Sequence, residues 1–187
     1  MSISSAPPVA AELDLIEQAQ QGNRDAFGEL VLMHYQGAIN VVYRLSGDLQ
    51  FAEDIAQETF IRVWDKLHTY RPVGSFRSWV YRIATNAALD TLRRKREEVD
   101  IEDVPLSAPG SGVEQTIIRQ QQAELVRQAV VELPEASRVV LVLREYEGLS
   151  YQEIADSLQI PVGTVMSRLS YARGALKKTL RRQMEVA

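Results

Sequence analysis

Apolar residues recur every three to four positions along almost the whole chain, which is the spacing of one face of an α-helix. Breaks at Gly22, Gly47, Pro72, Pro134 and Pro161 divide this pattern into separate helices. No segment alternates apolar and polar residues in the manner of a β-strand. The pattern therefore predicts an all-α fold.

One segment of different composition divides the helical pattern into two parts. Residues 97–114 combine six acids with Pro105, Pro109, Gly110 and Gly112 and carry only scattered apolar residues. Such a composition is typical of a flexible tether. We therefore predict two small helical domains, at residues 12–96 and 115–187, joined by a flexible acidic linker at 97–114 and preceded by a disordered N-terminus at 1–11.

Charge and composition narrow the class of protein. The chain has no cysteine and two isolated histidines, so we expect no disulfide, no metal site and no cofactor. It has no apolar run of transmembrane length and no signal peptide, so we expect a cytoplasmic protein without membrane insertion. The net charge of −4 is distributed unevenly along the chain, because residues 48–65 carry a net charge of −4 and residues 71–96 a net charge of +6. This asymmetry indicates an acidic protein-binding surface and basic nucleic-acid surfaces.

Residues 150–182 carry the most informative pattern. Ser150 and Glu153 have the spacing of a capping box, which begins a helix. Pro161 ends that helix, and a second apolar stripe follows with Val165, Leu169, Ala172 and Leu176. Two helices joined by a short turn form a helix-turn-helix, whose second helix enters the major groove of DNA.

The polar face of the second helix predicts the DNA contacts. Residues 162–182 contain six Lys or Arg and no acid, and small residues, hydroxyls and Arg suit contacts with bases and phosphates. The predicted contacts are Gly163, Thr164, Met166, Ser167, Arg168, Ser170, Tyr171 and Lys178. Two alternatives stay open. The helix can be a solvated basic helix of a bundle, and Arg168 can pair with Glu153 to fix the angle between the helices.

A second candidate surface lies on the helix predicted at residues 51–67. Its apolar arc is broad, and the remaining arc holds Asp54, Gln57, Glu58, Ile61 and Asp65. An exposed Ile within an acidic strip suits docking onto a basic protein surface. The alternative is a plain charged exterior with one stray Ile.

The helix predicted at residues 76–96 places Asn86 and Asp90 on the same stripe as Phe76 and Trp79. This combination fits a hydrogen-bonded pair in the core. It also fits a pocket that reads an unstacked base while aromatic rings stack on neighbouring bases. The basic run at 93–96 suits a phosphate backbone.

With these residues in view, the chain resembles the bacterial RNA polymerase sigma factors of the extracytoplasmic-function class. In the first domain the resemblance rests on AEDIAQETFIRVW (52–64) and FRSWVYRIATNAALDTLRR (76–94). In the second it rests on LPEASRVVLVLREYEGLSYQEIADSLQIPVGTVMSRLSYAR (133–173). The resemblance implies a protein that is monomeric when free, binds core RNA polymerase and promoter DNA, and is regulated by an anti-sigma factor.

The resemblance also implies a role for each surface. The acidic strip would dock on the clamp helices of the largest polymerase subunit, and the helix-turn-helix would read the "minus thirty-five" element as duplex DNA. The acidic linker would occupy the RNA-exit path of the polymerase. The "minus ten" element would be melted and read by Phe76, Arg77, Trp79, Arg82, Asn86, Asp90, Arg93 and Arg94.

Two residues depart from the family pattern. Gln159 stands where the family commonly has Gly, so we expect the turn to close without an easy left-handed residue. Met166 stands where a Lys or Arg often follows Gly-Thr-Val. Both departures bear on how the "minus thirty-five" element is read.

Two other classes of function compete with a sigma factor. A free-standing regulator of operator DNA would normally need a dimer to span two half-sites, and nothing in the sequence resembles a dimerisation helix. A nucleic-acid enzyme would need a phosphate-binding Gly-Lys-Ser/Thr loop or a cluster of metal ligands, and the sequence contains neither. We therefore predict an alternative sigma factor that is not an enzyme.

Overall fold

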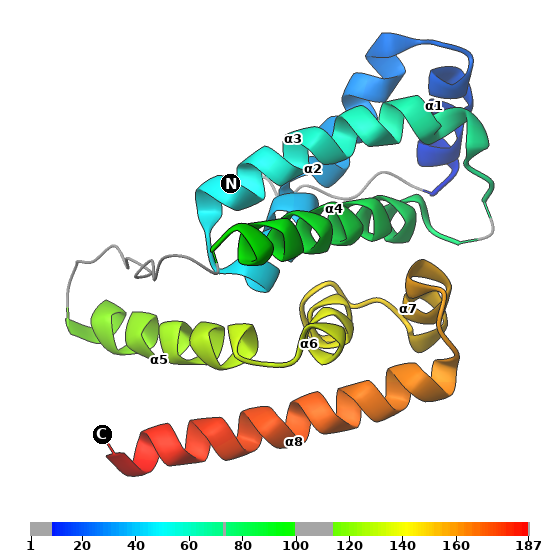
Figure 1. Ribbon diagram of the computed structural model, residues 1–187. Coiled ribbons are helices and arrows are strands. Elements are labelled where there is room, and N and C mark those ends of the chain that lie inside the picture. Colours follow the sequence, from blue (N-terminus) through cyan, green and yellow to red (C-terminus); the bar gives the residue numbers. More distant parts are fainter. Residues whose placement is uncertain (1–8, 73, 100–113, 187) are drawn as a thin grey trace.

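A computed structural model describes residues 9–72, 74–99 and 114–186, and these residues form helices and turns without a strand (Figure 1). The predicted all-α class is confirmed. Most of the predicted linker, at 100–113, and most of the predicted disordered N-terminus, at 1–8, lie outside the described residues. Among the described helices, none is long and apolar enough to cross a lipid bilayer.

The N-terminal domain contains α1 (Val9–Gln20), α2 (Arg24–Ser46), α3 (Leu49–Lys66) and α4 (Phe76–Val99). Local signals in the sequence set these bounds. The Asn23 side chain accepts hydrogen bonds from the first turn of α2, and Gly47, with φ of 78°, ends that helix. Asp48 then caps α3 by accepting from Phe51 N at 3.0 Å. The helices α2, α3 and α4 pack as a bundle, with α1 beside one end of it (Figure 1).

The C-terminal domain contains α5 (Glu114–Val131), α6 (Glu135–Leu141), α7 (Tyr151–Leu158) and α8 (Val162–Val186). Helix α6 is followed directly by a π-helical segment at Val142–Tyr146. Gly148, with φ of 68°, closes this segment as a left-handed residue. The second helix of the helix-turn-helix begins at Val162, as predicted.

The two domains pack directly against each other, which the sequence did not indicate. Helix α4 lies against α7, and α2 lies against α5 (Figure 1). Buried apolar residues of both domains form one continuous cluster, from Leu30 and Val80 in the first domain to Leu143 and Leu169 in the second. The N-terminal bundle and the helix-turn-helix therefore share a buried boundary.

Candidate nucleic-acid and protein interfaces

The acidic strip on α3 is exposed, as its sequence pattern predicted. Asp54, Gln57, Ile61 and Asp65 are exposed and Glu58 is half-buried, with Glu58 paired to Arg62 at 2.6 Å. The predicted apolar arc is turned inward, with Phe51, Ala52, Ile55, Ala56, Thr59, Phe60 and Val63 buried and Trp64 half-buried. Ile61 keeps 64% of its surface exposed, which is unusual for a large apolar side chain inside a charged strip.

Ile61 borders a shallow apolar hollow between α2 and α3. The hollow has a volume of about 500 Å³ and is lined by Arg24, Phe27, Gln57, Phe60, Ile61 and Trp64. The rings of Phe27 and Trp64 lie 4.8 Å apart and form its floor. Phe27 is not among the site residues predicted from the sequence, because its apolar spacing on α2 indicates packing and carries no sign of what lies beside it.

One face of α4 carries five of the predicted nucleic-acid residues. Trp79, Arg82, Asn86, Asp90 and Arg93 follow each other at intervals of three or four residues, so they lie on one side of the helix. Asn86, Asp90 and Arg93 are exposed, while Trp79 and Arg82 are half-buried. The alternative of a buried Asn86–Asp90 pair is therefore wrong.

Phe76 does not belong to this face, and its predicted contact with DNA is wrong. It is the first residue of α4 and is only 2% exposed. Its ring packs among those of Tyr70, Trp79 and His34, at centroid distances of 5.3, 5.6 and 5.4 Å. Phe76 is thus a core residue that anchors the start of α4.

Arg77 is exposed but lies on the other side of α4. It is nine residues from Asn86, which corresponds to two and a half helical turns. Its charge acts on Glu147 and Glu153 of the C-terminal domain instead. The structure therefore separates Arg77 from the face that holds Asn86.

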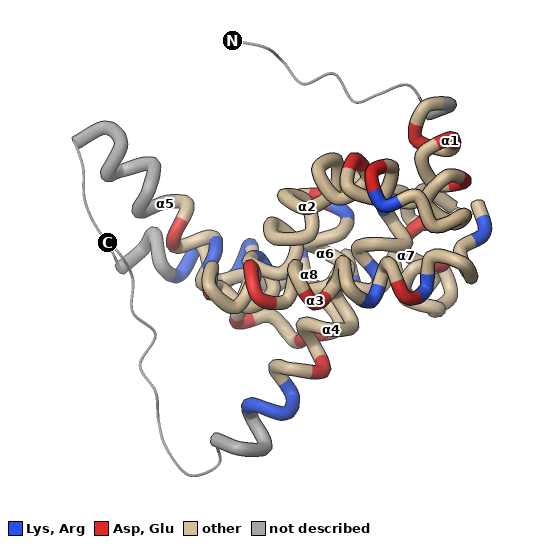
Figure 2. The backbone as a smooth tube through the Cα atoms, turned by 90° about the horizontal axis from the view of Figure 1, so that it is seen from above, with Lys and Arg blue, Asp and Glu red and all other residues tan. Residues whose placement is uncertain are grey.

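The end of α4 projects from the body of the molecule and carries basic residues (Figure 2). Arg94 is exposed, Arg93 is paired with Glu135 of α6, and Lys95 lies over the ring of Phe51 at 4.7 Å. An exposed, solvent-screened pair of this kind contributes little to stability. Arg93 can therefore exchange Glu135 for a phosphate.

The helix-turn-helix begins with the predicted capping box. Ser150 Oγ accepts from Glu153 N at 3.2 Å, and Glu153 Oε2 accepts from Ser150 N at 2.9 Å. Burial opposes the charge of Glu153, but hydrogen bonds from Ser150 and Ser75 and the charge of Arg77 outweigh it, so the pKa of Glu153 lies below its usual value. Glu153 therefore stays ionised at the N-terminus of α7, where the helix dipole favours a negative charge.

The turn closes differently from the expectation. Gln159 itself takes the left-handed conformation, with φ of 53° and ψ of 46°. A residue with a Cβ in this region costs about 1–2 kcal/mol relative to a right-handed conformation. The backbone N–H of Gln159 donates to the Ala155 carbonyl, so a strained left-handed residue ends α7 where Gly would be unstrained.

The predicted DNA-facing residues of α8 lie on its outer side. Val165, Leu169 and Ala172 are buried beneath the helix. On the outer side, Gly163, Met166, Ser167, Ser170, Tyr171 and Lys178 are exposed, and Thr164 and Arg168 are half-buried. Met166 and Tyr171 are 55% and 57% exposed, so each offers apolar surface to a partner.

The alternative role of Arg168 is not observed. Among the described residues, no ion pair joins Arg168 to Glu153, and Glu153 accepts instead from Ser75 Oγ of the N-terminal domain at 2.9 Å. A second basic residue of α8, Arg173, is paired with Glu145. Arg168 therefore keeps its charge available at the side of the outer face.

Two family models match the chain, one in each domain. "Sigma-70 region 2" matches residues 30–98, and "Sigma-70, region 4" matches residues 123–176. The first match covers α3 and all but the last residue of α4, and the second covers α7 and the first part of α8, up to residue 176. The two candidate surfaces of the N-terminal domain, and the predicted DNA contacts of α8 other than Lys178, thus fall within the matched regions.

Curated relatives and solved structures agree with these matches. The RNA polymerase sigma-H factor of Pseudomonas aeruginosa is 37% identical over 177 residues, which cover 89% of this chain and 92% of that protein. The ECF RNA polymerase sigma factor SigW of Bacillus subtilis is 34% identical, with 89% and 95% covered. The structure of CnrH in complex with the cytosolic domain of CnrY is 28% identical, with a TM-score of 0.72 and coverage of 92% and 98%. The chain belongs to the extracytoplasmic-function class of RNA polymerase sigma factors.

Proposed function

We propose that this sigma factor docks on the clamp helices of core RNA polymerase through α3 and reads a promoter with two separate surfaces. In this proposal the outer face of α4 opens and reads the "minus ten" element, and α8 reads the "minus thirty-five" element as duplex DNA. The class of protein supports the general activity. The assignment of polymerase docking to α3 and of the two promoter elements to α4 and α8 rests on the exposure and chemistry of the residues on each helix.

The observation that carries the proposal is the exposed Ile61 beside the hollow floored by Phe27 and Trp64. A free-standing DNA-binding regulator has no use for an apolar hollow beside an acidic strip on the side of its N-terminal domain. A sigma factor needs such a surface, because an apolar centre provides affinity and an acidic rim steers it to a basic partner.

The outer face of α4 has the chemistry needed for single-stranded DNA. Trp79 offers an aromatic surface on which a base can stack, and Arg82 can neutralise a phosphate. Asn86 can donate to and accept from the Watson–Crick edge of an unstacked base, and Asp90 can accept from an exocyclic amine. Arg93 and Arg94 extend this face toward the backbone of the flanking duplex.

The outer face of α8 suits the major groove. Gly163, Ser167 and Ser170 let the helix approach closely and offer hydroxyls for bases or phosphates. Met166 and Tyr171 offer apolar contact, for which a thymine methyl group is the available partner in the groove. Arg168 and Lys178 add charge for phosphates.

An anti-sigma factor is the proposed regulator. The similar protein CnrH was solved with the cytosolic domain of CnrY bound to it. A protein partner that covers α3 or α4 would prevent access to polymerase and DNA, because these surfaces carry the proposed contacts.

The test is transcription of genomic DNA by core RNA polymerase with and without this protein, followed by sequencing of the transcripts. We expect new start sites that share two spaced sequence elements. A gel shift on the mapped promoters should require core polymerase. Unchanged start sites, or tight sequence-specific binding by the protein alone, would contradict the proposal and favour a free-standing regulator.

A further inference from the structure

The last turns of α8 carry a cluster of basic side chains that lies outside the family match. The match to region 4 ends at residue 176, while α8 continues to Val186. Within residues 177–182 every exposed side chain is basic, and these four residues form the basic end of α8: Lys177, Lys178, Arg181 and Arg182. Of the four, only Lys178 is among the DNA contacts predicted from the sequence.

The basic end continues the outer face of α8. Arg181 follows Gly174 by seven residues, which is about two helical turns, so both lie on the side of the helix that holds Ser167. Leu176 and Leu180 extend the buried stripe and are half-buried. This half of α8 runs beside α5, beyond α6 and α7 (Figure 1). The outer face is therefore one continuous surface from the helix-turn-helix to the basic end.

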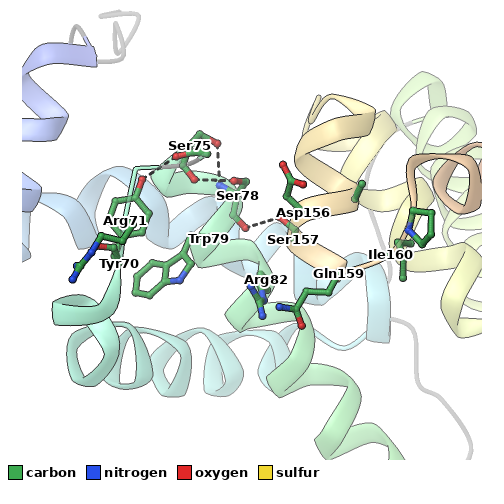
Figure 3. Close-up of a pocket in the computed structure, with 13 residues that line it drawn as sticks. Tyr70, Arg71, Ser75, Ser78, Trp79, Arg82, Asp156, Ser157, Gln159 and Ile160 are labelled. Carbon is green, nitrogen blue, oxygen red and sulfur yellow. Dashed lines mark hydrogen bonds between the residues drawn. The ribbon is translucent and has the colours of Figure 1, made fainter.

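The charges of the basic end are not paired with acids in the described part of the chain. Arg173, one turn earlier on α8, is paired with Glu145. The hollow beside α4 likewise holds both Arg82 and Asp156 (Figure 3). Among the side chains that the structure describes, no ion pair includes a residue of the basic end. Its four positive charges are thus available to an external partner.

The composition of the basic end favours a phosphate backbone over a protein surface. A protein interface has an apolar centre that supplies affinity, as Ile61 offers on α3. Within residues 173–182, by contrast, no apolar side chain is exposed. Lys and Arg side chains without an apolar centre suit duplex DNA, which carries one negative charge per about 1.7 Å of its axis. We therefore take duplex DNA as the partner.

Gly174 indicates that this partner approaches the helix closely. A Cβ at this exposed position would meet no other element of the described chain within 4 Å. Gly is less favourable than Ala inside a helix, and packing within the protein gives no reason for it here. Gly174 also lines both the hollow beside Ser170 and Tyr171 and the hollow beside Arg181. A backbone that passes over the outer face would need the space that Gly leaves open.

The dimensions of α8 place the basic end beyond the edge of the major groove. The N-terminal residues of a recognition helix contact base edges, and the groove is about 12 Å wide. At a rise of about 1.5 Å per residue, Lys177 and Arg181 lie about 15 and about 21 Å along the helix axis from Ser167. Because the groove winds around the duplex and the helix is straight, the end of α8 leaves the groove where the phosphates border it.

We propose that the basic end of α8 is a second DNA-contacting surface, which binds the phosphate backbone beside the "minus thirty-five" element. This inference rests on the proposed function, because it requires that α8 reads duplex DNA. Phosphate contacts hold a protein on the duplex but carry no sequence information. The basic end therefore sets the affinity and salt dependence of the promoter complex, while the residues before Gly174 select the promoter.

The first test removes the four charges from the full-length protein. The quadruple variant combines Lys177→Gln, Lys178→Gln, Arg181→Gln and Arg182→Gln, which keeps residues of similar helix propensity at exposed positions. Binding of variant and wild-type sigma factor, each preassembled with excess core polymerase, to a mapped promoter is measured across a salt series. Because each phosphate contact contributes about 0.9 to the log–log slope, we expect a slope less steep by about three to four units. Between about 50 and 200 mM salt, the wild type should then lose roughly 100-fold more affinity than the variant.

The second test removes charge from the DNA instead. Neutral methylphosphonate linkages replace the phosphates that flank the "minus thirty-five" element, and both proteins are measured on both promoters. We expect the wild type to lose at least tenfold in affinity on the neutralised promoter and the quadruple variant to lose little, because the two changes remove the same contacts. Start sites mapped with the quadruple variant should be those of the wild type. Lys66→Gln is the control for loss of an exposed positive charge elsewhere and should leave the slope unchanged.

The outcomes separate this inference from the proposed function. An unchanged salt slope in the quadruple variant would overturn the inference and leave the proposed function standing. A loss of affinity for core polymerase in the absence of DNA would also overturn it, because the basic end would then bind an acidic protein surface. Equal losses of both proteins on the neutralised promoter would place the contacted phosphates elsewhere on the sigma factor. Wild-type protein that gives no new start sites with core polymerase would refute the proposed function itself.

Discussion

Ile61 offers the sharpest test of the docking surface on α3. The side chain is 64% exposed in the free protein and borders the hollow floored by Phe27 and Trp64. Full burial of an Ile side chain contributes about 1.5–3 kcal/mol. Docking that covers the exposed two thirds would therefore contribute about 1–2 kcal/mol.

Ile61→Ala should weaken binding to core polymerase about five- to tenfold, because it removes most of this apolar surface without adding a clash. Ile61→Arg combined with Asp54→Lys should abolish co-purification with core polymerase, because it also reverses the acidic rim. Helical content should stay unchanged in both variants, since both residues are exposed.

The assay is titration of labelled sigma factor with core polymerase, with affinity derived from fluorescence anisotropy. Leu32→Ala is the matched control, because Leu32 is 76% exposed in the same domain but does not line the hollow. Wild-type affinity in Ile61→Ala and normal co-purification of the double variant would refute the docking assignment. An equal loss in Leu32→Ala would show that the effect is not specific to α3.

Three further predictions test α4, α8 and the domain boundary. Asn86→Ala should change the free energy of unfolding by less than about 1 kcal/mol, because Asn86 is exposed. The same substitution should slow the melting of promoter DNA at the start region, as detected by permanganate. Normal melting would show that Asn86 does not read the "minus ten" element. Met166→Lys should add one phosphate contact and steepen the log–log salt dependence of duplex binding by about one unit, and an unchanged slope would mean that Met166 does not face DNA. Burial raises the pKa of Glu147 above its ordinary 4.5, while a hydrogen bond from Tyr81 and the charges of Arg77 and Arg44 oppose this. The folded chain thus binds the proton of the Glu147 carboxyl more tightly than the unfolded chain does, so the free energy of unfolding should fall as pH rises from about 4.5 through the raised pKa. Glu147→Gln should flatten this part of the pH dependence in a series of denaturation experiments. An unchanged pH dependence in Glu147→Gln would contradict the raised pKa of Glu147.

Local signals made much of this fold predictable. Gly47, Pro134 and the capping box of Ser150 with Glu153 act within a few residues of the helix ends they set, and the structure has all three where the sequence placed them. The outer face of α8 was also predictable, because a single buried stripe fixes the rotation of the helix.

The residues of α4 were harder to assign, for a physical reason. Beside the buried Val80, Ala84 and Ala87, this helix has a second buried flank of Ser78, Tyr81, Thr85 and Ala88, which do not form an apolar stripe. A helix with two buried flanks has no single apolar direction, so the pattern grouped Phe76 with Asn86 although one is in the core and the other in solvent. Only the position of α7 shows which side of α4 remains free.

The contact between the two domains could not be predicted from the sequence, because several hydrogen bonds across it are accepted by main-chain carbonyls. Arg138 donates to Leu45 O at 2.6 Å, and Arg127 donates to Gly47 O at 3.1 Å. These carbonyls lie at the C-terminal end of α2, where a helix has acceptors without partners of its own. Water can replace an arginine at such a carbonyl, and the net free energy of exchanging one hydrogen bond for another is small. The sequence shows which arginines are present but not which carbonyls they reach, so this boundary could be located only in the structure.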